Sequence, residues 1–259
     1  MTTRHARRSP FGDQDQMGAM HYVKPEMLIT LFQQVKQGRI FDLGHEIQMG
    51  APRIEPFMLP YTMNMWTSAE KMRKLLRDQM HATNEFGALL ESIHMTMHTG
   101  THIDALGHAT IADEMFNGFS AEESIGDWGL QNLGIEHCPP ILTRVVVLDI
   151  ARYKNRAHLD AGMVVTPQDL EATAKAQQVT LREGDVVLVH TGWGQLFMVD
   201  NATYVAGEPG LGEEAAHWLT EQHIAVIGAD NMAVEVMPGE SPQRVFPVHQ
   251  HFLVEAGST

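Results

Sequence analysis

The sequence predicts an α/β protein in which some strands pair in parallel. In the second half of the chain, helical segments alternate with short apolar segments rich in β-branched residues, and polar residues follow those apolar segments directly. The chain has 259 residues, of which 44% are hydrophobic and 19% charged, which is ordinary for one large globular domain. No internal repeat or linker stands out, so we predict a mobile polar arm over residues 1–20 and a single domain over residues 21–259.

The first elements are predicted from apolar spacing and proline positions. Residues 25–37 carry apolar side chains three and four positions apart behind a proline, which predicts a helix that ends before a glycine. Residues 40–47 (IFDLGHEI) are expected to form a strand. Residues 49–66 contain three prolines and are expected to form a long loop at the wall of a pocket. Trp66 in this loop is a candidate to stack on a flat substrate, or to pack beneath the loop.

The middle of the chain contains a helix and a strand before its most polar stretch. Residues 67–70 (TSAE) match a capping box, which predicts a helix to about Met80. Residues 89–97 (LLESIHMTM) partly alternate between apolar and polar side chains and are predicted to form a strand. Residues 120–130 are expected to contain a short helix.

Five segments of the second half define the predicted parallel sheet and its crossover helices. The predicted helices span residues 166–178 and 213–223, and the predicted buried strands span residues 141–150, 185–190 and 224–228. Ligands of α/β proteins bind at the carboxyl ends of such strands. His190, Trp193 and Asp230 follow these ends, so we expect them to contact the substrate.

Composition excludes several classes of function. A net charge of -14 argues against binding to nucleic acid or to an anionic membrane surface. No segment contains about 18 consecutive apolar residues, so no membrane span is expected. Cys138 is the only cysteine, which excludes an internal disulfide and a multi-cysteine zinc site. The single cysteine and the lack of a secretory signal pattern together predict a cytoplasmic protein.

The stretch HTGTHIDALGH, residues 98–108, is the most informative in the chain. Two histidines and a carboxylate at this spacing suit a divalent metal ion, which makes His98, His102 and Asp104 candidate ligands. In extended backbone, residues two apart point to one face, and a glycine turn would bring in the first histidine. His108 has its own backbone approach beside this cluster, which suits proton transfer.

The same stretch resembles the conserved pattern of the metal-dependent cyclase family, which includes bacterial kynurenine formamidase and isatin hydrolase. The segments IFDLGHEI, DVVLVHTGW, IAVIGAD and FPVHQHFLVEAG resemble further parts of that family, so the resemblance runs from about residue 40 to the end. It implies a swivelling β/β/α fold with a mixed sheet. Members are usually oligomeric, so we expect a homodimer or a homotetramer.

The resemblance also implies a reaction, namely hydrolysis of an amide, formamide or cyclic imide bond with zinc or manganese. The metal ligands that it implies are His98, His102, Asp104 and either His249 or His251. His249 is the nearer match because Pro247 and Val248 precede it as in the family segment. His108 becomes the catalytic acid/base.

In the expected mechanism, a bound metal activates water to attack a carbonyl, and His108 moves the proton to the leaving nitrogen. The expected substrate is a small planar or cyclic amide flanked by Trp66 and Trp193. Two alternatives remain open. One is a non-haem iron oxygenase in which His102, Asp104 and a distant histidine bind the iron, and the other is a metal-binding protein without enzymatic activity.

Overall fold

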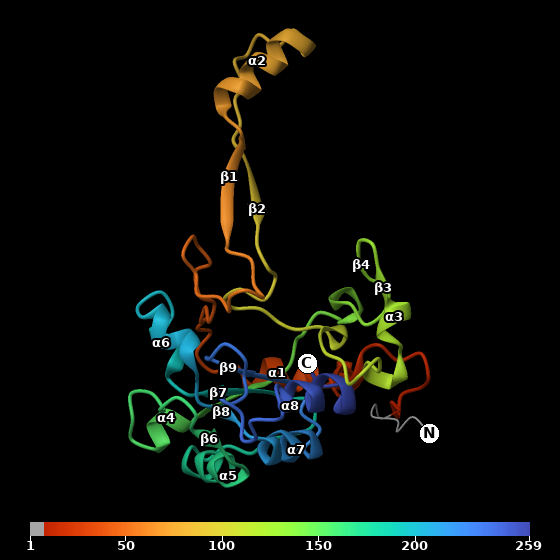
Figure 1. The fold of residues 1–259 in the computed structure, drawn as a ribbon, viewed down its shortest axis with the longest axis vertical. Coiled ribbons are helices and arrows are strands. Elements are labelled where there is room, and N and C mark those ends of the chain that lie inside the picture. The colour runs from red at the N-terminus through yellow and green to blue at the C-terminus, as the bar shows by residue number, and fades with distance from the viewer. Residues whose placement is uncertain (1–7) are drawn as a thin grey trace. The chain divides into compact units, whose positions relative to one another are not determined.

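The computed structural model describes residues 8–259, and the chain divides into two compact units. Unit 1 comprises Met1–Asp42 and Ile103–Thr259, and unit 2 comprises Leu43–His102. Figure 1 labels the helices and strands of both. Helices occur together with parallel and antiparallel sheets, so the predicted α/β class is confirmed.

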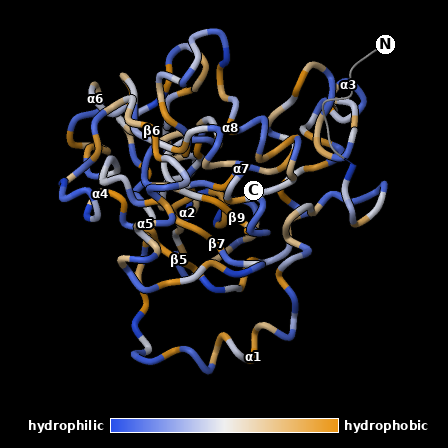
Figure 2. The backbone as a smooth tube through the Cα atoms, turned by 90° about the horizontal axis from the view of Figure 1, so that it is seen from below, coloured by the Kyte–Doolittle hydropathy of each residue, from blue (hydrophilic) through white to orange (hydrophobic). Residues whose placement is uncertain are grey.

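A three-stranded parallel sheet forms the centre of unit 1. Its strand order is β5 (Val145–Asp149), β7 (Val186–His190) and β9 (Val226–Ala229). Val186 of the central strand lies beside Val145 on one side and Val226 on the other. The strands are short apolar runs, as buried parallel strands are, and Figure 2 shows hydrophobic residues concentrated along them. The predicted strands and their parallel pairing are confirmed.

Two predicted helices pack against this sheet. They are α5 (Pro167–Ala176) and α7 (Glu213–Glu221), and both contribute buried leucines to the core that contains the strand valines. At the start of α5, the Thr166 hydroxyl accepts from the Asp169 amide and the Asp169 carboxylate accepts from the Thr166 amide, each at 3.2 Å. This reciprocal cap satisfies two backbone donors that a helix start leaves unpaired.

The rest of unit 1 consists of short elements. The two small sheets pair β3 (Ile125–Gly126) with β4 (Gly129–Leu130) in antiparallel and β6 (Val164–Val165) with β8 (Gly210–Leu211) in parallel. The helices are η1 (Gly18–Tyr22), α1 (Pro25–Gln34), η2 (Leu106–His108), η3 (Phe116–Gly118), α3 (Ala121–Ser124), η4 (Ile135–His137), α4 (Ile150–Tyr153), η5 (Trp193–Leu196), α6 (Asn201–Ala206), α8 (Pro247–His249) and the π-helix η6 (Gln250–Ala256).

Unit 2 is built on a two-stranded antiparallel sheet. Strand β1 (Thr62–Thr67) pairs with β2 (Leu90–His94), and helix α2 (Ala69–Met80) lies between them in the sequence. The Ser68 hydroxyl caps α2 by accepting from the Lys71 amide at 3.3 Å. The helix predicted to end at about Met80 and the strand predicted over residues 89–97 are confirmed as α2 and β2. Trp66, which was predicted to lie in a loop, lies in β1.

The structure differs from two sequence predictions of secondary structure: one predicted strand is absent, and one predicted helix is shorter. Residues 40–47 form no strand, and the apolar side chains of Ile40, Phe41 and Leu43 are exposed. An extended segment becomes a strand only where a neighbour completes its hydrogen bonds. The helix predicted over residues 120–130 ends at Ser124, because the following residues pair as β3 and β4.

Part of the predicted N-terminal arm is packed into unit 1. Residues 1–7 lie outside the described residues. Asp15 is buried and accepts hydrogen bonds from the Ser9 hydroxyl and from backbone amides. The Ala19 amide donates to the Gly257 carbonyl at 2.7 Å. Among residues 8–259, we find no helix with the length and apolar character that a membrane crossing requires.

Candidate metal centre

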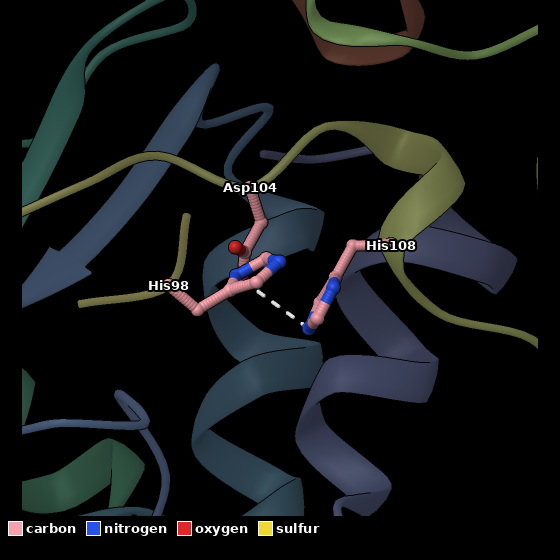
Figure 3. A group of neighbouring side chains, drawn as sticks. All are labelled: His98, Asp104 and His108. Carbon is pink, nitrogen blue, oxygen red and sulfur yellow. Dashed lines mark ion pairs between the residues drawn. The ribbon is translucent and has the colours of Figure 1, made fainter. Parts of the chain in front are cut away.

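Three predicted site residues of unit 1 come together around Asp104. Nε2 of His108 and Nε2 of His249 each lie 3.9 Å from Asp104 Oδ2. The two imidazole rings have centroids 6.1 Å apart. Figure 3 draws Asp104 and His108, and its dashed line marks their ion pair. Residues far apart in the sequence therefore present one carboxylate and two imidazoles to a common point.

The backbone around His108 is fixed by a close approach to the loop at Leu133. The Gly107 amide donates to the Leu133 carbonyl at 3.0 Å, and the His108 amide donates to the Ala105 carbonyl at 2.9 Å. A Cβ on residue 107 would lie 3.0 Å from the Leu133 oxygen and 2.5 Å from a methyl carbon of Leu130. Glycine is required here because any side chain would push the two segments apart.

A buried glutamate orients His249. Glu235 is 1% exposed, and its Oε1 lies 2.5 Å from His249 Nδ1 and 3.0 Å from the His249 amide nitrogen. Its Oε2 accepts from the Val248 amide at 3.3 Å. A carboxylate only accepts hydrogen bonds, so His249 carries its proton on Nδ1. Its unprotonated Nε2 lies 3.9 Å from Asp104 Oδ2, and a metal-binding histidine typically has such a carboxylate on its other ring nitrogen.

These side chains fit a divalent metal ion. In a tetrahedral zinc site with bonds of about 2.0 Å, neighbouring ligand atoms are about 3.3 Å apart. The 3.9 Å separation between Asp104 Oδ2 and His249 Nε2 is close to that distance. One carboxylate with imidazole nitrogens is also a ligand set that several divalent metals accept.

The first two histidines of the motif belong to unit 2. The rings of His98 and His102 have centroids 5.1 Å apart and are nearly perpendicular. His102 Nδ1 lies 2.8 Å from the Gly100 carbonyl oxygen, so this nitrogen carries the proton. Gly100 has a φ of +65°, which a side chain would strain. The boundary between the units falls after His102, so the linear motif contributes residues to both.

His251 lies in a different environment from His249. Its Nδ1 is 2.9 Å from Glu255 Oε2, and its Nε2 is 2.9 Å from the Thr220 hydroxyl. Burial lowers the pKa of His251 despite the nearby Glu255 carboxylate. Of the two histidines left open by the sequence, His249 is therefore the one beside Asp104.

His190 and Asp230 meet at the carboxyl end of the central strand. His190 Nδ1 lies 2.8 Å from Asp149 Oδ1, and its Nε2 lies 3.5 Å from Asp230 Oδ2. Burial would raise the pKa of Asp149, but hydrogen bonds from His190 and from the Arg152 amide bring it below its ordinary value. Asp230 also accepts from the Thr191 amide and hydroxyl, at 2.7 and 2.6 Å, and so holds the turn after the strand.

The two predicted stacking tryptophans have very different surroundings. Trp193 is 2% exposed, and its indole N–H donates to the Tyr204 carbonyl at 3.3 Å. Trp66, in unit 2, is 70% exposed, with the Lys71 ammonium 5.4 Å from its ring centroid. Trp193 therefore packs in the interior of unit 1, whereas Trp66 presents its ring at a surface.

Two buried glutamates were not predicted from the sequence. Glu235 precedes His249 by 14 residues, and no local motif connects them. Glu208 accepts from the amides of Met232 and Ala233 at 2.7 and 2.8 Å. Burial raises the pKa of Glu208 to about 8, with a further contribution from the Glu235 and Asp230 charges. The segment between Asp230 and Glu235 is thus held from within by carboxyl groups.

Asp104, His108 and His249 therefore form a candidate metal site in a protein with an α/β fold. Residues 41–236 match the family described as "Putative cyclase", and the chain belongs to that family. The sequence resemblance is thereby confirmed. A search of curated proteins finds no significant match.

Three solved structures illustrate the similarity. A protein described as a novel cyclase has 28% identity and a TM-score of 0.84, over 98% of this chain and 84% of that one. Isatin hydrolase A from Labrenzia aggregata, bound to benzyl benzoate, has 22% identity and a TM-score of 0.60, over 89% and 83% of the two chains. Isatin hydrolase A from Ralstonia solanacearum has 18% identity and a TM-score of 0.60, over 90% and 83%. At these identities the two hydrolases share the fold with this chain.

Proposed function

We propose that the protein is a metal-dependent hydrolase that cleaves the C–N bond of an amide, a formamide or a cyclic imide or lactam. The reaction resembles that of an arylformamidase or an isatin hydrolase. The observation that carries this proposal is the convergence of Asp104, His108 and His249 in unit 1. Membership of the cyclase family supports it.

The proposed cofactor is a divalent ion, zinc or manganese, because carboxylate and imidazole ligands serve both. The residues proposed to hold it are His98, His102, Asp104 and His249. When bound, such an ion activates water and polarises the substrate carbonyl. Glu235 holds the His249 ring in one orientation and one tautomer, so the protein supplies a prearranged nitrogen.

His108 is proposed to be the acid/base. Its Nε2 lies 3.9 Å from Asp104 Oδ2, and imidazole is the side chain most often used for general acid–base catalysis. It accepts a proton from the attacking water and delivers it to the leaving nitrogen. The water oxygen bonds to the acyl carbon, the C–N bond breaks, and the amine or aniline leaves with the proton.

The proposed substrate is a small planar or cyclic amide. Trp66 supports this proposal, because its exposed ring is available to stack on a flat molecule. Trp193, His190 and Asp230, which lie at or just after the ends of β7 and β9, are also proposed to contribute to substrate binding. The Michaelis constant for an aromatic amide is expected to rise in Trp66→Ala, and an unchanged constant contradicts a stacking role.

Hydrolysis of a set of carbonyl compounds tests the proposed function. N-formylkynurenine, isatin, a cyclic imide and a lactone are incubated with the full chain, with and without chelator, followed by zinc or manganese. We expect hydrolysis that the chelator abolishes and the metal restores, in the wild type and in the surface control His137→Ala. Hydrolysis that survives complete metal removal contradicts the proposal, and oxygen consumption with added iron favours an oxygenase.

We also propose that the protein is a homodimer or a homotetramer. The two-stranded sheet of unit 2 exposes large apolar side chains, among them Met63, Met65 and Ile93, and an isolated two-stranded sheet is marginally stable in water. A second copy that covers these side chains would stabilise it. Light scattering after gel filtration is expected to give at least twice the monomer mass of 28.9 kDa, and a monomer contradicts this.

A further inference from the structure

A second group of potential metal ligands lies in unit 1, apart from Asp104. It consists of His217 on α7 and of His251 and Glu255, one turn apart on η6. One ligand atom from each of the three residues lies within 4.8 Å of the others. The rings of His217 and His251 have centroids only 3.7 Å apart. We call this group the α7/η6 cluster.

Hydrogen-bond donors and acceptors around Thr220 fix the tautomer of His251. The Thr220 hydroxyl lies 2.9 Å from the His217 carbonyl oxygen and 2.9 Å from His251 Nε2. A carbonyl oxygen can only accept, so the single hydroxyl proton of Thr220 is donated there. The second contact then requires His251 Nε2 to donate, which means that Nε2 carries a proton.

This tautomer leaves a conflict on the other side of the ring. His251 Nδ1 lies 2.9 Å from Glu255 Oε2, and in a neutral ring with Nε2 protonated both atoms are acceptors. Two acceptors at this distance need a cation between them. That cation is either a proton, carried by His251 as an imidazolium or by Glu255 as a carboxylic acid, or a metal ion, which would also engage the adjacent His217.

We propose that His217, His251 and Glu255 bind a divalent transition-metal ion of the zinc type, at a site separate from the one around Asp104. Two imidazoles and one carboxylate are a common zinc ligand set, with water in the fourth position. Thr220 hydrogen-bonds to His251 Nε2 and is the outer partner that orients this ligating histidine. His217 is exposed and Glu255 half-buried, so both side chains can close the remaining distance to about 3.3 Å between ligand atoms.

Zinc titration of the metal-free full chain in competition with a chromophoric chelator tests the site. The Asp104→Asn variant weakens the first centre and serves as the background. In it we expect one remaining equivalent of zinc, bound at least 10-fold more weakly after His217→Ala or Glu255→Gln. Glu171→Gln, an exposed carboxylate change on α5, is the matched control and should bind as the background does. Thermal unfolding checks that every variant is folded.

Nitrogen-15 NMR of the histidine side chains gives a second, independent readout. On addition of zinc to the Asp104→Asn background, the His251 Nδ1 signal is expected to shift as a metal-bound nitrogen while Nε2 keeps its proton. Protons on both nitrogens at zinc saturation would mean that His251 is an imidazolium paired with Glu255, which overturns the proposal. Equal zinc affinity in the background, His217→Ala and Glu255→Gln would overturn it as well.

Discussion

Replacing Glu235 by glutamine is expected to weaken metal binding far more than it weakens the fold. The glutamine oxygen can occupy the position of Oε1, where it still accepts from the His249 amide and from His249 Nδ1. The acceptor lost is the one for the Val248 amide, whose contact is already long at 3.3 Å. We therefore expect the free energy of unfolding to fall by only about 1 kcal/mol.

Glu235→Gln also removes the negative charge beside His249 Nδ1. This loss is expected to affect metal affinity more than it affects the free energy of unfolding. Removal of an outer carboxylate partner from a metal-binding histidine typically costs roughly 10- to 100-fold in metal affinity. In Glu235→Ala the amides of His249 and Val248 both lose their acceptor in the interior, at about 1 to 3 kcal/mol each, so this variant should lose fold stability as well.

The two effects are separated by two measurements on the same variants. Zinc affinity of the metal-free protein is measured by chelator competition, and unfolding by urea is followed by circular dichroism. Glu221→Gln, an exposed change on α7, should match the wild type in both. If Glu235→Gln binds zinc as tightly as the wild type, the orienting role of Glu235 is refuted.

Three further predictions concern other parts of unit 1. His108→Ala should keep its metal but lose at least 100-fold in turnover, and loss of the metal would instead make His108 a ligand. Arg144→Ala breaks the two-contact ion pair with buried Asp185 and should cost about 3 to 5 kcal/mol in urea unfolding, whereas the exposed change Arg152→Ala should cost little. For Glu208, the raised pKa of about 8, against 4.5 in the unfolded chain, means that its stabilising contribution is complete below pH 4.5 and is lost as pH rises through 8. The difference in unfolding free energy between wild type and Glu208→Gln should therefore fall with rising pH, and a constant difference contradicts the shift.

Local rules predicted the elements whose stability is decided locally. The helix that begins at Pro167 follows from the Thr166 cap, its proline and the acid in its first turn. The strands around Val187 follow from β-branched residues that fill a buried parallel sheet. The segment at residues 40–47 was also predicted to be a strand but has no neighbouring strand, and the presence of a neighbour is not encoded in the segment itself.

The candidate site was predictable where it is contiguous in sequence. The stretch that holds Asp104 and His108 contains its own spacing and glycines. Glu235 was not predictable, because its contact with His249 depends on how two distant segments pack. The choice between His249 and His251 needed the helical geometry: residues two apart on a helix point to nearly opposite sides, so only one of them can face Asp104.

The position of a bound metal ion tests the central claim most directly. Crystals of the full chain grown with zinc are measured at the zinc absorption edge, so that anomalous scattering locates the ion. We expect a peak within about 2.2 Å of both Asp104 Oδ2 and His249 Nε2. Zinc-loaded crystals with no peak at Asp104 would contradict a metal centre built on this carboxylate.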